Sequence, residues 1–131
     1  MSHLPTPGAI IYAKNLSKLS GFYEQVLRPT ATHANDDYTI FELPHFQLVI
    51  HAIPPQIANT FEILVPPQLR SDTAIKLMLP VASISKARDV AAKLGGRIDA
   101  ENYEWEFQHY RICDGYDPEG NVIQLREYLS R

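Results

Sequence analysis

The sequence lacks the features that mark disulfide-bonded, nucleic-acid-binding, membrane-spanning and secreted proteins. Only one of its 131 residues, Cys113, is a cysteine, so an intrachain disulfide is impossible; we expect a buried structural thiol and a reduced, cytoplasmic setting. The net charge is −3 without a basic block, which argues against nucleic acid and anionic membranes as partners. No apolar run approaches the ~20 residues that span a bilayer. The N-terminus lacks the basic and apolar regions of a signal peptide.

Two segments of the chain repeat one pattern of strand and helix. A short apolar strand over residues 8–13 is followed by Asn15 or Ser17 as a helix cap, and Pro29 ends that helix. A second strand over residues 75–81 is followed by Ser83 as a cap. The apolar helix positions Leu16, Leu19, Phe22, Tyr23 and Val26 correspond, at a constant offset of 68, to Ile84, Ala87, Val90, Ala91 and Leu94. The constant offset indicates an internal duplication.

Each predicted helix is followed by three strand-like segments. They cover residues 30–34, 37–43 and 46–52 in the first half, and residues 97–100, 106–115 and 122–127 in the second. The run Asp117-Pro118-Glu119-Gly120-Asn121 is typical of a turn. We therefore predict an α+β fold of two tandem βαβββ modules, module one over 8–52 and module two over 75–128. The proline-rich linker, 53–74, contains an apolar island at 61–65, for which we expect an extra strand, a lid or a dimer contact.

Three stretches carry a resemblance to a known superfamily. They run from Asn15 to Leu27, from Val81 to Gly96, and from Asp117 to Leu125, and the last is the most specific. Together they resemble the vicinal oxygen chelate superfamily, which includes glyoxalase I, bleomycin-resistance proteins and extradiol dioxygenases. The resemblance covers most of the chain and implies one glyoxalase-like domain over 1–131. It also implies curved mixed sheets that form a cleft, helices on the outside, and a homodimer.

Strand alternation predicts which side chains enter this cleft. In the strand over 75–81, the apolar set that includes Ile75 should face the helix. The side chains expected on the cleft side are Gly8, Ile10 and Tyr12, then Lys76, Met78 and Pro80, and finally Val122, Gln124 and Arg126.

The resemblance also implies where a metal would bind. Metal-dependent members place ligands near the start of each module's first strand and in each module's last strand, which maps to Gly8, Lys76, Gln124 and a position within 49–51. Glycine offers no donor, an ammonium group repels a cation, and a glutamine brings no charge. At most His51 remains as a donor, so we expect neither a metal nor another cofactor at this site.

A metal site built from other residues is an alternative. His51, His109, Glu106 and Asp114 are its candidates, although they have no close ligand spacing. We favour the interpretation that His51 and His109 are partly buried strand histidines.

The charged and aromatic residues of the cleft point to two kinds of ligand. Lys76 is expected to pair with an anionic ligand group or, internally, with Glu42 or Glu106. Arg126 is expected either to bind an anion or to form an ion pair at the rim of the cleft. Trp105, which lies between two glutamates, suits a planar aromatic or cationic ligand instead.

These observations predict a protein that binds a small molecule in the cleft, without the usual divalent metal. The candidate ligand-binding residues are Tyr12, His51, Lys76, Met78, Trp105, Gln124 and Arg126. The alternative is a lyase, isomerase or dioxygenase of the same superfamily, either metal-dependent or using His51, Glu106 and Tyr12 for acid/base chemistry. A third alternative is a partner-binding module that uses residues 61–65.

Overall fold

Two sheets with the same strand order form the framework. In the computed structural model, which describes residues 4–130, each sheet begins with a strand that pairs in parallel with the last strand of its module. Module one has the order β1-β4-β3-β2, from β1 (Gly8–Ala13), β2 (Ala31–Ala34), β3 (Tyr38–Leu43) and β4 (Phe46–Ala52). Module two has the order β5-β9-β8-β6, from β5 (Leu77–Pro80), β6 (Arg97–Ile98), β8 (Tyr110–Tyr116) and β9 (Val122–Tyr128), and β7 (Trp105–Phe107) also pairs with β8. The shared order confirms the predicted α+β fold of two βαβββ-like modules.

The two main helices begin at the predicted caps. Before α1 (Leu16–Leu27), the Asn15 side chain accepts a hydrogen bond from the Lys18 N–H at 3.0 Å, and before α3 (Ile84–Lys93), the Ser83 hydroxyl accepts from Lys86 at 3.1 Å. Two shorter helices, α2 (Pro55–Ala58) and η1 (Glu101–Tyr103), lie in the connections. In the described part of the chain, every helix is too short or too polar to cross a bilayer.

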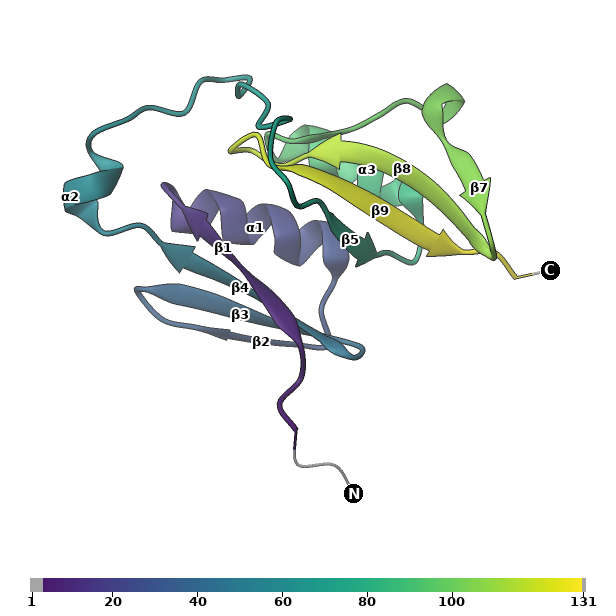
Figure 1. Cartoon of the computed structure of the whole chain (residues 1–131), viewed down its shortest axis with the longest axis horizontal. Coiled ribbons are helices and arrows are strands. Elements are labelled where there is room, and N and C mark those ends of the chain that lie inside the picture. Colours follow the sequence, from purple (N-terminus) through teal and green to yellow (C-terminus); the bar gives the residue numbers. More distant parts are fainter. Residues whose placement is uncertain (1–3, 131) are drawn as a thin grey trace.

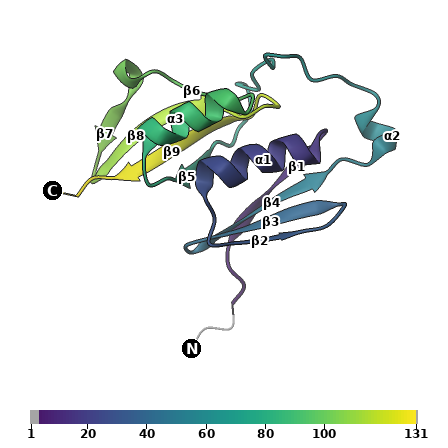
Figure 2. The same cartoon turned by 180° about the vertical axis from the view of Figure 1, so that it is seen from behind.

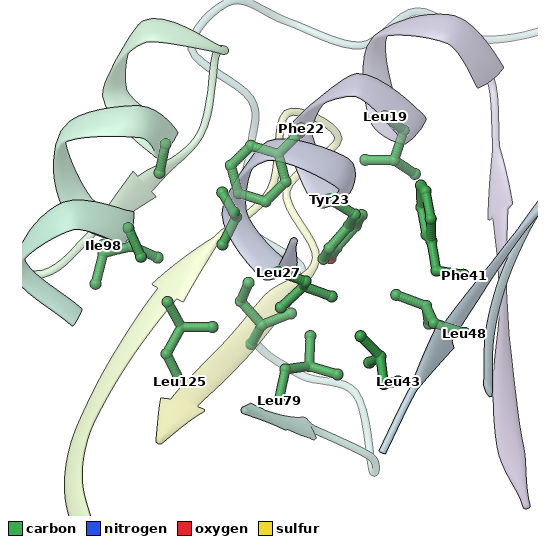
Figure 3. Close-up of a cluster of buried hydrophobic side chains, with 14 of the residues drawn as sticks. Leu19, Phe22, Tyr23, Leu27, Phe41, Leu43, Leu48, Leu79, Ile98 and Leu125 are labelled. Atoms are coloured by element: carbon green, nitrogen blue, oxygen red, sulfur yellow. The ribbon is translucent and has the colours of Figure 1, made fainter. Parts of the chain in front are cut away.

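The helices α1 and α3 lie on the same side of the two sheets (Figures 1 and 2). They pack against each other and close one continuous core, which joins both modules. Phe22 and Tyr23 are fully buried and contact edge to face, with ring centroids 5.0 Å apart. Figure 3 shows these rings between Phe41 and Leu48 of module one and Ile98 of module two. The opposite faces of both sheets therefore stay open.

The turn over residues 117–121 fastens module two to module one. The buried Glu119 carboxylate accepts hydrogen bonds from the backbone N–H groups of Lys14 and Asn15, at 2.9 and 2.8 Å. The Tyr23 hydroxyl donates to the buried Asp117 carboxylate at 2.6 Å. We call this set of contacts the inter-module clasp.

Two expectations about local structure are wrong, and one of the three alternatives for residues 61–65 is excluded. Residues 106–115 form a hairpin rather than one strand, because Gln108 takes φ 56° and allows Phe107 to pair with Tyr110; His109 is therefore exposed in a turn. Ile75 precedes β5 and is 77% exposed instead of facing the helix. Residues 61–65 form no strand; there, the ammonium group of Lys14 lies over the Phe61 ring.

Candidate functional site

The candidate site has two parts, which meet between the modules. The first is the face of the two sheets that lies opposite to α1 and α3 (Figures 1 and 2), which we call the open face. The second is a hollow of about 650 Å³ between the edge strands β1 and β5, which we call the seam pocket. Its wall is formed by residues 8–12 and 121–123, with Phe46, Arg70, Thr73, Ile75 and Leu77. Of the seven predicted ligand-binding residues, only Tyr12 lines this pocket.

On module one, the open face carries an aromatic row around His51. The strand register places Tyr12 and Tyr38 on either side of His51, and their rings lie 5.8 and 6.1 Å from the imidazole. The His51 Nδ1 lies 2.9 Å from the carbonyl oxygen of Ala52, a contact that requires Nδ1 to carry the proton. In neutral His51, Nε2 is then the basic nitrogen.

On module two, a chain of polar side chains crosses the open face. Lys76 Nζ donates to one Asp114 carboxylate oxygen at 3.2 Å, and Gln124 Nε2 donates to the other at 3.2 Å. Arg126 Nε in turn donates to Gln124 Oε1 at 2.9 Å. The lysine therefore has an internal partner, but it is Asp114 and neither Glu42 nor Glu106.

Aromatic and apolar side chains surround this polar chain. The Arg126 guanidinium lies over the Tyr110 ring, 5.9 Å from its centroid. Trp105 is opposite Ile112 in the β7–β8 register and is 42% exposed, and Met78 is 59% exposed. Lys76, Met78, Trp105, Gln124 and Arg126 thus lie together on module two, whereas Tyr12 and His51 lie on module one.

Sequence reasoning missed the role of Asp114 as the partner of Lys76 and Gln124. The turn over residues 117–121 sets the register that brings them together. The Asp117 N–H donates to the Asn121 carbonyl, so Tyr116 pairs with Val122. Two residues further from the turn on each strand, Asp114 pairs with Gln124. The register of one hairpin would have placed the two side chains opposite each other.

The strand register identifies the fourth position of the implied metal site. Gln124 pairs with Met78, whose counterpart in the repeat is Ile10, and Ile10 pairs with Val49. Val49 is therefore the counterpart of Gln124. His51 lies two residues beyond Val49 on β4, so it does not occupy the implied ligand position.

The side chains at these four positions do not fit a divalent metal. A Cβ atom at position 8 would lie 2.1 Å from the Gln47 carbonyl oxygen, so the backbone leaves no room for a side chain at Gly8. Val49 has no donor atom, Lys76 brings a positive charge, and the Gln124 amide is engaged at both ends. The four positions thus supply one neutral oxygen and no negative charge.

The alternative metal cluster is also not assembled. Within residues 4–130, no three histidine, cysteine, aspartate or glutamate side chains are close enough together to hold an ion. His51 lies on module one, while His109 and Glu106 belong to the β7–β8 hairpin of module two.

The marked pKa shifts lie on the helix side of the sheets and not on the open face. Burial, followed by the nearby Asp117 charge, raises the pKa of Tyr23 well above its ordinary value. Burial likewise raises the pKa of Asp117 and of the Cys113 thiol. Cys113 is fully buried and donates to the Asp99 carbonyl, so it is a structural thiol and not a nucleophile.

The strand order, the paired modules and the helices on one side define the fold of glyoxalase and bleomycin-resistance proteins. A glyoxalase/bleomycin resistance protein/dioxygenase family enzyme from Burkholderia phytofirmans has a TM-score of 0.66 and 17% identity, over 96% of this chain and 100% of that one. The fosfomycin resistance protein FosX from Mesorhizobium loti has a TM-score of 0.62 and 11% identity, over 97% and 93% of the two chains.

A bleomycin resistance determinant encoded on a transposon is also similar, with a TM-score of 0.56 and 15% identity over 95% of this chain and 98% of that one. No protein-family model and no curated protein matches the sequence. At these identities the similarity establishes the fold, and it confirms the predicted structural resemblance across the chain.

Proposed function

We propose that this protein binds a small organic molecule between its modules and does so without a divalent metal at positions 8, 49, 76 and 124. The observation that carries the proposal is the side-chain set at these positions. Gly8 has no space for a side chain, Val49 has no donor, and the only charged group, Lys76, is a cation paired with Asp114. Recognition must then come from ordinary polar and apolar contacts.

The open face supplies such contacts. The proposed ligand-binding residues are Tyr12, His51, Lys76, Met78, Trp105, Gln124 and Arg126. Tyr12 and Met78 are 57% and 59% exposed, so large apolar surfaces are available beside the polar groups. The seam pocket adds a hollow large enough for a compact organic molecule.

Two further features accompany this proposal. We propose a homodimer, supported by the exposed apolar side chains Ile10, Tyr12 and Met78, which a second copy would shield from water. We also propose a cytoplasmic setting, supported by the single thiol.

A compound screen with and without chelator tests the proposal. Trp105 is the only tryptophan of the chain and lies on the open face, so its fluorescence reports ligands there. Small planar and apolar compounds would be screened against untagged protein, before and after dialysis against EDTA. We expect compounds that bind with the same affinity in both samples. Binding that disappears with EDTA and returns with a divalent metal would contradict the proposal, and so would the absence of any binding compound.

A second candidate function is acid/base catalysis at His51. The contact of Nδ1 with the Ala52 carbonyl makes Nε2 the basic nitrogen, and the imidazole lies beside the Tyr12 ring on the open face. Glu106 does not join them, because it shares a row with Arg111 on the other face of module two. If this function holds, any turnover found will be lost in both His51→Gln and His51→Asn, while ligand binding persists. Turnover that survives both substitutions would exclude His51 as the base.

A further inference from the structure

Among the described residues 4–130, one charged residue lines the seam pocket, Arg70. Most of the wall is apolar, with Ile10, Phe46, Ile75 and Val122 among its residues. Arg70 comes from the linker between the modules, a segment without any of the predicted ligand-binding residues. The connection between the modules thus contributes the one formally charged side chain that the described part of the chain brings to this hollow.

The backbone of Arg70 is held in place by module two. Its N–H donates to the Gly120 carbonyl at 2.8 Å, and Arg70 forms a parallel bridge with Asn121. A Cβ at position 120 would lie 2.2 Å from the Gln68 carbonyl oxygen, so the glycine permits this close approach of the linker. Arg70 is therefore positioned by main-chain contacts.

The Arg70 guanidinium is not neutralised within the part of the chain that the structure describes. It is partly buried and also borders a second hollow, lined by Glu62 and Asp72 among others. None of the ion pairs among residues 4–130 includes Arg70. When a bound molecule displaces water from a guanidinium, the charge needs an opposite charge or hydrogen-bond acceptors in place of that water. An anionic ligand would provide both.

Two neutral polar side chains of the wall, Thr73 and Asn121, have other partners. The Thr73 hydroxyl contacts the carbonyl oxygens of Arg70 and Ile75, and the Asn121 amide donates to Asp117. Arg70 is therefore the charged donor available to an acceptor in the pocket, and the Tyr12 hydroxyl is a neutral one. One guanidinium balances one negative charge, and its fork of N–H groups matches a carboxylate.

We propose that the seam pocket binds a small carboxylic acid, with the carboxylate at Arg70 and the apolar body against Ile10, Phe46 and Ile75. This inference rests on the proposed small-molecule function and adds the chemical class of the ligand. Arg70 is the residue that sets the charge preference of the pocket.

Three probes with one apolar body and three charges test the assignment. 4-Phenylbutyrate, 4-phenylbutanamide and 4-phenylbutylamine would be titrated into the full-length protein by calorimetry. We expect the carboxylate to bind about tenfold or more tightly than the amide, and more tightly than the amine. Arg70→Gln should remove this preference without weakening the amide, and Arg70→Lys should keep part of it. Lys86→Gln is the matched control, since it removes an exposed positive charge from α3.

Retained amide binding shows that the Arg70→Gln protein is folded. The inference is overturned if the amide or the amine binds the wild-type protein as tightly as the carboxylate, if Arg70→Gln keeps the preference, or if none of the three probes binds. Equal binding of the probes refutes only the assignment to acids, because the small-molecule function then still stands. That function fails separately if the wider compound screen finds no binding at all.

Discussion

The Glu119 carboxylate of the inter-module clasp gives a prediction whose size follows from the structure. Glu119 is 3% exposed and accepts two backbone hydrogen bonds, from Lys14 and Asn15 just before α1. A hydrogen bond to a charged group contributes about 1.5–3 kcal/mol. Glu119→Gln keeps one acceptor oxygen and should lower the free energy of unfolding by about 1.5–3 kcal/mol. Glu119→Ala loses both bonds and should cost about 3–6 kcal/mol.

Urea unfolding followed by circular dichroism and Trp105 fluorescence measures this loss. Glu24→Gln is the matched control, because it makes the same chemical change on the exposed surface of α1 and should stay within about 0.5 kcal/mol of wild type. The reasoning is refuted if Glu119→Gln is as stable as this control. Glu119 would then not be the group that satisfies the two N–H donors.

Two further predictions concern the packed core. Burial and the Asp117 charge raise the pKa of Tyr23, so the folded state keeps a proton that the unfolded chain releases above pH ~10. Above that pH the free energy of unfolding should therefore fall by about 1.4 kcal/mol per pH unit. Tyr23→Phe should remove this slope, and an unchanged slope would exclude Tyr23 as its cause. Gly96→Ala should cost about 1–3 kcal/mol in urea unfolding, because its Cβ would lie 2.4 Å from the Phe22 ring. Gly21→Ala, with nothing within 4 Å, should instead stabilise α1 by roughly 0.5–1 kcal/mol, and equal effects of the two substitutions would contradict the packing argument.

The sequence predicts the architecture well because short-range sequence patterns mark the elements of both modules. Helix caps, apolar periodicity and the turn at 117–121 act over a few residues, and the two modules repeat them at a constant offset. The hairpin at Gln108 escaped prediction because its positive φ is adopted by a residue other than glycine or asparagine. Two apolar strands joined without a turn signal look like one.

The candidate site is predicted less completely because its contacts are long-range. Alternation places Lys76, Gln124 and Arg126 on the open face, but the choice of Asp114 as partner depends on the register between β8 and β9. The seam pocket depends on how the linker crosses module two, which no local pattern of the linker reveals. Arg70 was therefore absent from the predicted site.

The implied metal positions show how sequence and structure complement each other. The superfamily resemblance implies the positions of Gly8, Lys76 and Gln124, while the fourth position follows from the pairing of Ile10 with Val49. The structure adds a steric reason why position 8 cannot carry a metal ligand: the Gln47 carbonyl leaves no space for a side chain there. The proposal of metal-independent binding depends on these four positions together.

The metal content of untagged protein, grown with added manganese, iron, cobalt, nickel and zinc, tests this central claim most directly. The account predicts that elemental analysis finds far less than one divalent metal per chain, in wild type and in Gln124→Ala alike. One equivalent of metal in the wild-type protein that is lost in Gln124→Ala would contradict it.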